Sequence, residues 1–309
     1  MSDKILRCLL TACTFLFVLH GLAQTKTFYA VDQAQSRVIR AQAGKSAVDW
    51  EWRVDQRIPD SARKWFSNLS EVKPVYAQKY LLITASGGGV ALVRLDDKKA
   101  VFVAYAGGNT HSAELLPDGN IVAASSTGGY LSLIRTDTTV APAAVQVTRI
   151  KMPDAHNVVW DRKRQLLWAT GGTTLYGLAY NMNCKNPALE IREQLALPEA
   201  GAHDLFPVFG QDKLWLSTHD HTWSLDFATK KFSEVTAFSR IKSISSGPET
   251  YPLIMLRAID TNKKWYHQQL INEKEAVIFN IEGLQIYKAR WDVPNTFSYP
   301  DTHKFTICQ

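Results

Sequence analysis

Three histidines begin three copies of one sequence phrase. His111 opens HSAELLPDGNIVAAS, His156 opens HNVVWDRKRQLLWATGG, and His203 opens HDLFPVFGQDKLWLSTHD, so they lie 45 and 47 residues apart. A neutral imidazole accepts a proton as a general base, forms hydrogen bonds and binds divalent metals. Because each histidine holds the same position in its copy, we expect the three side chains to meet at one site, and we predict that they are its catalytic residues.

Further copies carry lysine at this position, in VKPVYAQKYLLITASGG, IKSISSGPETYPLIMLRA and YKARWDVP. The predicted ring of equivalent residues is Lys73, His111, His156, His203, Lys242 and Lys288. Like charges that lie close together disfavour protonation, so we expect neutral histidines and lysines of lowered pKa. An anion such as a uronate, a sulfate or a phosphate fits this ring, with the three lysines neutralising it.

The segment His219-Asp220-His221 indicates a different use of the imidazoles. Alternation along an extended chain puts the His219 and His221 side chains on one side. Joined to the ring histidines, they would hold one divalent metal ion, for which imidazole is a normal ligand. A structural role, in which the histidines are only hydrogen-bonded inside the fold, stays open as well. Loops after the second strand of each repeat supply three further candidates for ligand binding, Asp32, Ser86 and Ser125.

The elements that position these residues follow from the repeat length. A step of about 43 residues matches one four-stranded blade of a β-propeller. The turn Pro117-Asp118-Gly119-Asn120 lies between two apolar runs, as it would between paired strands. Because no long amphipathic helical period interrupts the repeats, we predict an all-β fold. The stretch from Asp55 to Glu71 is expected to be a long loop between blades.

The two ends of the chain predict how the ring closes. Residues 28–32, 37–40 and 50–54 read as the second, third and fourth strands of a blade that lacks its first strand. The segment that begins at Lys288 would supply the missing inner strand from the C-terminus. Pairing the two ends removes exposed strand edges. We therefore predict six blades, with five or seven as alternatives.

Residues 1–24 have the composition of a signal peptide. Lys4 and Arg7 precede an apolar run from Cys8 to Leu22, which is short for a membrane span. The sequence predicts export to the periplasm or the medium, no transmembrane segment after cleavage, and a single propeller domain over 25–309. The box Leu10 to Cys13 would allow a lipoprotein instead, although it lies inside the apolar run.

The remaining composition limits the partners. Cleavage would remove Lys4, Arg7 and Asp3 from the 35 basic and 29 acidic residues, leaving 33 and 28. This mild excess is dispersed, so no nucleic-acid partner is expected, and a monomer is expected because no dimerisation element is evident. Cys184 and Cys308 would remain, either bonded in an oxidising compartment or free.

Several of these phrases also carry a resemblance. HSAELLPDGNIVAAS, VKPV, IKSIS and YKARW resemble an uncharacterised family of exported bacterial propellers, over most of residues 26–295. That resemblance implies the fold and export. More distantly, the pattern at His219 and His221 is similar to that of oligogalacturonate lyases, in which a His-x-His pair binds a divalent metal and basic residues support β-elimination. This chain is shorter, has one predicted blade fewer, and does not align with the remaining ligands or the base of those enzymes.

Two hypotheses of function follow. The first is an enzyme that acts as a lyase or hydrolase on an acidic oligosaccharide, where lysines or a metal hold the carboxylate and a neutral histidine removes the α-proton. The second is a propeller that binds a glycan or a protein without catalysis. Three tryptophans near loops or ends are candidates for stacking on a sugar ring, namely Trp65, Trp265 and Trp291.

Overall fold

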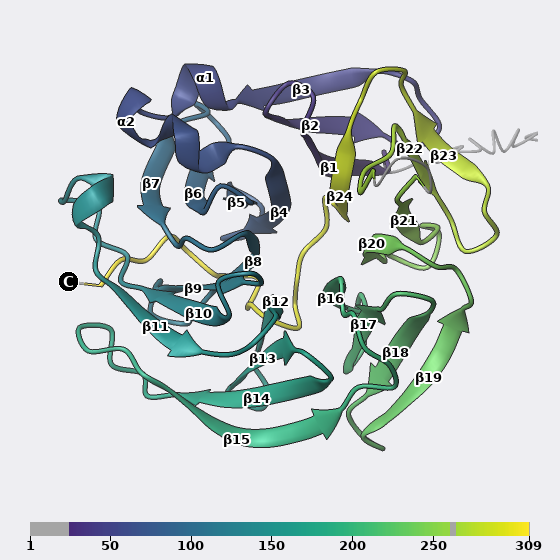
Figure 1. The fold of residues 1–309 in the computed structure, drawn as a ribbon. Coiled ribbons are helices and arrows are strands. Elements are labelled where there is room, and N and C mark those ends of the chain that lie inside the picture. Colours follow the sequence, from purple (N-terminus) through teal and green to yellow (C-terminus); the bar gives the residue numbers. More distant parts are fainter. Residues whose placement is uncertain (1–24, 260–263, 309) are drawn as a thin grey trace, which may run out of the picture.

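The computed structural model describes residues 25–259 and 264–308. Its strands form six four-stranded antiparallel sheets, arranged as blades around a central channel (Figure 1). The fold prediction, an all-β propeller with six blades, is confirmed. The predicted signal peptide, residues 1–24, lies outside the described residues.

The strands of each blade are given from the channel outward. Blade 1 contains β24 (Ile286–Trp291), β1 (Thr27–Asp32), β2 (Arg37–Gln42) and β3 (Val48–Arg53). Blade 2 contains β4 (Leu69–Val75), β5 (Tyr80–Ala85), β6 (Gly89–Arg94) and β7 (Ala100–Tyr105). Blade 3 contains β8 (Thr110–Leu115), β9 (Ile121–Ser125), β10 (Tyr130–Ile134) and β11 (Val147–Lys151).

The other three blades follow the same pattern. Blade 4 contains β12 (Ala155–Asp161), β13 (Leu166–Gly171), β14 (Thr174–Tyr180) and β15 (Leu189–Ala196). Blade 5 contains β16 (Asp204–Pro207), β17 (Lys213–Ser217), β18 (Thr222–Asp226) and β19 (Lys231–Thr236). Blade 6 contains β20 (Ile241–Ser245), β21 (Ile254–Arg257), β22 (Gln269–Ile271) and β23 (Val277–Asn280).

Blade 1 joins the two ends of the chain, as predicted. Strand β24 pairs antiparallel with β1, with Phe28 opposite Trp291 and Ala30 opposite Ala289. The inner strand of this blade therefore comes from the C-terminal part of the sequence, and the pairing closes the ring without leaving an unpaired inner edge.

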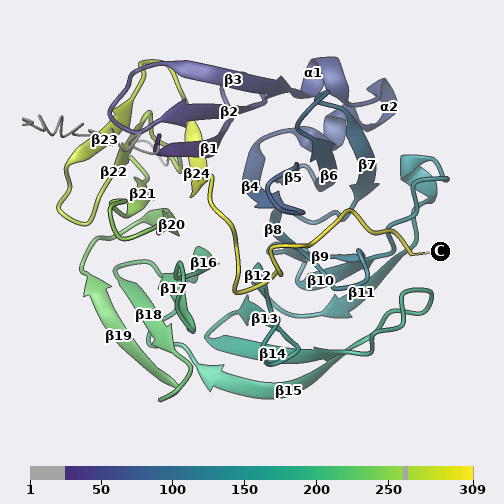
Figure 2. The same ribbon diagram turned by 180° about the vertical axis from the view of Figure 1, so that it is seen from behind.

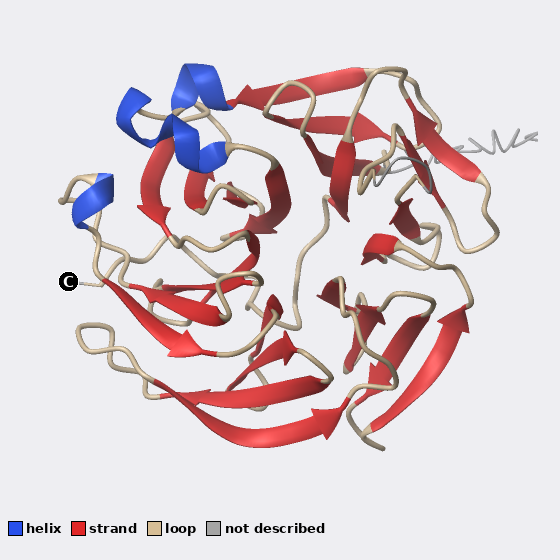
Figure 3. Cartoon of the chain, in the orientation of Figure 1, coloured by secondary structure: helices blue, strands red, loops and turns tan. Residues whose placement is uncertain are grey.

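Helical turns lie between blades 1 and 2 (Figure 3). These are α1 (Val54–Arg57), α2 (Asp60–Arg63) and η1 (Lys64–Phe66); another turn, η2 (Pro142–Ala144), precedes β11. Strand β4 begins at Leu69, so the loop ends at Asn68, three residues earlier than the predicted end at Glu71. In the described part of the chain, no helix has the length and apolar character that crossing a membrane requires.

A bulge near the start of the inner strands positions the candidate residues. The pairing register with the second strand shifts around one extra residue, which is Ser70 in β4, His111 in β8, His156 in β12 and Lys242 in β20. Bulges of this kind redirect a side chain relative to the strand. His203 holds the same position directly before β16, where its backbone N–H donates to the Ser217 carbonyl at 2.8 Å.

The C-terminal tail, residues 292–308, crosses the face of the ring opposite these bulges (Figure 2, yellow). The Tyr299 hydroxyl accepts a hydrogen bond from the Leu115 backbone N–H, and the Arg162 N–H donates to the Phe297 carbonyl. A disulfide joins Cys308 to Cys184, which answers the question that the sequence left open. The tail therefore covers the end of the channel away from the histidines.

Candidate functional site

A cavity of about 350 Å³ lies at the upper mouth of the channel, the end that the bulges face. Four members of the predicted ring and one of the predicted loop residues line it together. Its lining residues are Gln33, Asn68, Ser86, Asn109, His111, His156, His203, Lys242, Trp265 and Tyr287. The structure thus brings His111, His156, His203 and Lys242 together at one opening.

The imidazoles form a continuous arc around the mouth. The His111 and His156 rings are stacked, with centroids 4.7 Å apart and planes 5° from parallel. The His203 ring meets His156 edge to face at 5.7 Å. At the two ends of the arc, the Tyr287 hydroxyl lies 3.3 Å from His111 Nδ1, and His203 Nε2 lies 3.2 Å from His219 Nδ1.

His111, His203 and Lys242 are disfavoured as cations. Burial lowers the pKa of His111 well below its usual value, and the neighbouring His156 and Lys288 lower it further. Burial, then Lys242, lowers the pKa of His203 to about 2. Burial also lowers the pKa of Lys242 itself to about 8, followed by the charges of Lys288 and Arg240. The directions agree with the sequence prediction, but desolvation is the main cause and like-charge repulsion the smaller one.

Lys242 is the cation of this cavity. Within residues 25–259 and 264–308, no carboxylate lies at ion-pair distance from its ammonium group, and the charges that shift its pKa are all positive. An ammonium that is largely withdrawn from water without a counterion is unfavourable. An anion that entered the cavity would supply that counterion.

His156 has a carboxylate partner. Its Nδ1 lies 3.0 Å from Asp154 Oδ1, and the Asp154 side chain is half exposed. A carboxylate oxygen accepts a hydrogen bond from an N–H at Nδ1, and in that tautomer the lone pair of the imidazole is on Nε2. This is how a carboxylate orients a histidine that acts as a base.

Two predicted members of the ring lie elsewhere, and their placement at the mouth was wrong. Lys73 is 2% exposed inside the channel, with its Nζ 3.0 Å from Glu114 Oε2. Lys288 is fully buried, with its Nζ 2.9 Å from Asp204 Oδ1. The positions equivalent to the histidines are Ser70 in β4 and Tyr287 in β24.

These two lysines belong to a buried ionic layer below the mouth. Arg290 bridges Glu71 and Asp204 from β24, and its guanidinium is completely buried. Although burial opposes it, the charges of Arg290 and Lys288 hold the pKa of Asp204 below its usual range. Burial raises the pKa of Glu114 to about 7, against the opposing charge of Lys73. The layer consists of Glu71, Lys73, Glu114, Asp204, Lys288 and Arg290.

Two predicted loop residues are held by the fold instead of lining the cavity. Asp32 is buried and accepts hydrogen bonds from Arg37 Nε at 2.8 Å and from the Gln285 backbone N–H. The Ser125 hydroxyl is buried and donates to the Gly107 carbonyl at 2.6 Å. Neither side chain lines the cavity, whereas Ser86 does.

The His-x-His pair does not converge. His219 turns toward His203, while His221 Nδ1 lies 2.9 Å from Glu199 Oε2, a hydrogen bond that raises the pKa of His221. Among the residues with described positions, no group of three His, Cys, Asp or Glu side chains is arranged to hold a metal ion. His219 and His221 therefore have different hydrogen-bond partners and form no such group in the described chain.

A sequence signal for the correct register exists two positions before each bulge residue. Asn68, Asn109, Asp154, Gly201 and Arg240 stand there, and all have positive φ, between 52° and 77°. Asparagine, aspartate and glycine adopt this left-handed conformation most readily. Reading Asn68-Leu69-Ser70 as the counterpart of Asn109-Thr110-His111 places Ser70 in the ring and also finds Asn68 and Asn109, which the repeat phrase alone missed.

The tryptophans divide by exposure. Trp160 and Trp168 are buried in the core, and so is Trp291, at 1% exposure, which excludes it from stacking on a ligand. Trp65 is half-buried. Trp265 is 48% exposed at the rim of the cavity, where its Nε1 donates to the Gln33 side chain at 2.9 Å.

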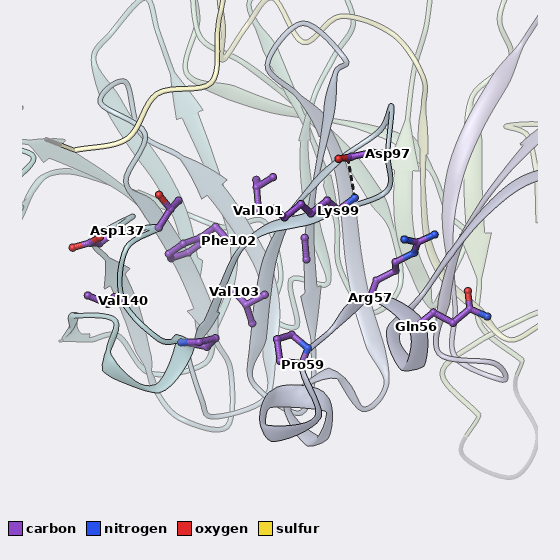
Figure 4. Close-up of a pocket in the computed structure, with 13 residues that line it drawn as sticks. Gln56, Arg57, Pro59, Asp97, Lys99, Val101, Phe102, Val103, Asp137 and Val140 are labelled. Carbon is purple, nitrogen blue, oxygen red and sulfur yellow. Dashed lines mark hydrogen bonds between the residues drawn. The ribbon is translucent and has the colours of Figure 1, made fainter.

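A second cavity, of about 490 Å³, lies at the outer edge of blade 2 (Figure 4). It is bounded by α1, strand β7 and the loop that carries Asp137 and Val140. Its carboxylate Asp97 is occupied by the Lys99 backbone N–H and by the Arg94 guanidinium. Asp137 accepts hydrogen bonds from the Thr139 backbone N–H and hydroxyl. The convergent imidazoles and Lys242 lie at the channel mouth instead.

Comparison with known families agrees with this architecture. The model of a family of unknown function, DUF6528, matches residues 22–309. The chain belongs to this family. The family carries no assigned activity in its description, so membership supports the fold and leaves the chemistry to the geometry of the site.

Two solved structures show the same fold. A protein of unknown function from Bacteroides caccae superposes with a TM-score of 0.60 at 11% identity, over 86% of this chain and 98% of that one. The Cps50 (Swd1) β-propeller domain of Myceliophteria thermophila gives 0.52 at 13% identity, over 84% and 87%. A comparison with curated proteins finds no match. Neither structure is an oligogalacturonate lyase, and that resemblance remains an expectation.

Proposed function

We propose that this DUF6528 member binds a small acidic carbohydrate at the channel mouth. The observation that carries the proposal is Lys242, a largely buried ammonium without an anionic partner among the described residues, in a cavity walled by three imidazoles. A carboxylate would be held by Lys242. A cavity of about 350 Å³ is in the range of small-ligand sites.

The other lining groups suit the rest of a sugar. Neutral imidazoles and the side-chain amides of Gln33, Asn68 and Asn109 offer both donors and acceptors to hydroxyl groups. The exposed ring of Trp265 at the rim is of the kind that stacks on a sugar face. This combination supports a uronate better than an inorganic anion, which would leave the amides and the indole unused.

The test is calorimetric titration of residues 25–309 with glucuronate, galacturonate and the matching neutral hexoses. We expect the uronates to bind. The neutral sugars should bind at least about tenfold more weakly, because they lack the ion contact with Lys242. Lys242→Met should remove the difference. Lys45→Met, at an exposed lysine away from the cavity, is the matched control. Equal binding of uronates by both variants would disprove the proposal.

A second candidate function is elimination from the same acidic sugar, and the Asp154–His156 pair favours it. With Nδ1 engaged by Asp154, His156 Nε2 would take the proton α to the ligand's carboxylate, while Lys242 stabilises the charge that develops there. The group at the β-carbon then leaves and a carbon–carbon double bond forms. His156→Ala should abolish formation of unsaturated sugar but retain uronate binding. If the unaltered protein binds uronates but forms no unsaturated sugar, elimination is disproved and the binding function remains.

We also propose that the protein works outside the cytoplasm. The apolar run in residues 8–22 and the bond between Cys184 and Cys308 support this, because disulfides persist in oxidising compartments. Cell fractionation, followed by mass determination of the non-reduced protein, tests it. Cytoplasmic protein with residues 1–24 retained and free thiols would contradict it.

A further inference from the structure

Three loops lie side by side on the upper face, between the cavity and the outer edge of blades 2 and 3. They are residues 86–88, 106–109 and 126–129. The Ala106 backbone N–H donates to the Gly88 carbonyl at 2.7 Å, and the Gly128 N–H donates to the Gly108 carbonyl at 3.0 Å. The inner ends of the first two loops, at Ser86 and Asn109, line the cavity. A continuous strip of surface therefore leads from the channel mouth outward along this seam.

Aromatic rings cover the outer part of the strip. Tyr105, at the end of β7, is 42% exposed and lies against the Trp65 ring, with centroids 5.3 Å apart. Tyr130, at the start of β10, is covered on one side by the Arg149 guanidinium, 4.6 Å from the ring centroid. Exposed rings with a cation beside them are the components of a surface that stacks on sugars and holds negative charge.

The backbone under these rings is glycine where any side chain would collide with them. A Cβ at Gly88 would lie 2.6 Å from the Tyr105 ring, and a Cβ at Gly108 or Gly128 would lie 2.8 Å from the Tyr130 side chain. Gly88 and Gly108 also have positive φ, at 97° and 60°. The two tyrosines can therefore lie flat on the loops, which makes the strip a built feature of this seam.

Other blades lack this arrangement. At the first residue of the third strand, where blade 3 has Tyr130, the remaining blades carry Arg37, Gly89, Thr174, Thr222 and Gln269. Arg149 is also exposed, and in the described ranges no carboxylate is paired with it. The strip thus adds a second cation without an internal counterion, on the same face as Lys242.

We propose that the strip of Trp65, Tyr105, Tyr130 and Arg149 is an extended subsite for a linear acidic oligosaccharide. The inference rests on the proposed function: one sugar occupies the mouth beside Lys242, and the following sugars lie along the strip, with one ring stacked on the exposed Tyr105 and a carboxylate at Arg149, which Tyr130 supports from below. The ligand is then a chain of acidic sugars, and a free monosaccharide is only its minimal fragment.

Calorimetric titration of four uronate monomers and their hexasaccharides tests this, with maltohexaose as the neutral chain and hexaglutamate as the acidic peptide. The uronates are glucuronate, galacturonate, mannuronate and guluronate. We expect a hexasaccharide to bind at least about tenfold more tightly than its monomer, because it gains one stacked ring and one ion contact. Tyr105→Ala and Arg149→Gln should each lose most of this gain while the affinity for the monomer is unchanged. Arg192→Gln, at an exposed arginine in blade 4, is the matched control.

The outcomes separate the two proposals. Monomer binding that depends on Lys242, with equal affinity for the hexasaccharide, would overturn the extended subsite and leave the proposed function intact. A gain that survives in Tyr105→Ala and Arg149→Gln would also overturn it. Tighter binding of hexaglutamate than of every hexasaccharide would replace the glycan by an acidic peptide. No binding of any acidic sugar would overturn both proposals.

Discussion

The channel contains two layers of charge, one above the other, and they are built in opposite ways. The lower layer has three basic and three acidic side chains in direct contact, among them Lys288 and Asp204 at 2.9 Å. The upper layer has Lys242 and the imidazole arc, without a carboxylate paired to the lysine in the described chain. Internal pairing makes the lower layer part of the scaffold. The upper layer leaves its lysine without such a partner in the described chain, and under the proposed function a ligand supplies it.

The largest change in stability is expected when an ion pair of the lower layer is broken. Asp204→Asn keeps the side-chain shape but leaves Lys288 and Arg290 with Glu71 as their remaining anionic partner. Removing one member of a buried ion pair typically costs about 3–5 kcal/mol. We expect the free energy of unfolding, measured by urea denaturation, to fall by about that amount. A loss below about 1 kcal/mol would mean that the layer is hydrated and not structural.

The second test alters the upper layer and should act in the opposite direction. The folded-state pKa of Lys242 is lowered to about 8, so the unfolded state binds more protons between pH 8 and the ordinary lysine range. The stability of the unaltered protein should therefore rise across that window. Lys242→Met should be more stable at pH 7 by about 2 kcal/mol and should lose the rise, whereas Lys45→Met should keep it. Urea denaturation at several pH values measures both.

Uronate binding should follow the same titration. The anion needs the protonated ammonium, so affinity should decrease as the pH rises through about 8, the lowered pKa of Lys242. Titration calorimetry from pH 6 to 9.5 would measure it. A constant affinity over this range would show that Lys242 does not hold the ligand.

A smaller effect is expected from Glu114, the weakest acid of the lower layer. Burial raises its folded-state pKa to about 7, so the folded state binds more protons than the unfolded state between the ordinary glutamate range and pH 7. The stability that this proton provides is complete at low pH and is lost as pH rises through 7. Glu114→Gln should reduce that decline by about 1–2 kcal/mol. An unchanged pH profile would contradict the raised pKa.

The smallest effect is expected at the end of the arc. Tyr287→Phe removes the hydroxyl 3.3 Å from His111 Nδ1, a single hydrogen bond worth about 0.5–1.5 kcal/mol. Uronate affinity should change by less than about threefold, because Lys242 is untouched. Loss of binding in this variant would instead assign the tyrosine hydroxyl to the ligand.

The same comparison explains what the sequence could predict. A repeated phrase is a strong signal, so the six blades, their closure and four residues of the mouth followed from it. The lower layer was not predicted because its members pair across blades, as Lys288 does with Asp204, and no local pattern records such contacts. Lys73 was misplaced because the loop before β4 was extended to Glu71, beyond the true strand start at Leu69. Lys288 was misplaced by one residue because it was matched to Lys242 as a lysine, whereas the pairing of β24 with β1 makes Tyr287 the equivalent residue.

The tail that crosses the lower face determines from which side a ligand can reach the channel. Residues 292–308 cover one end of the channel, and a disulfide fixes their end to the loop after β14. The channel is therefore accessible from the upper mouth only. A long chain cannot thread through it. Under the proposed function, a sugar that enters the mouth must leave by the same opening, so binding and release share one path.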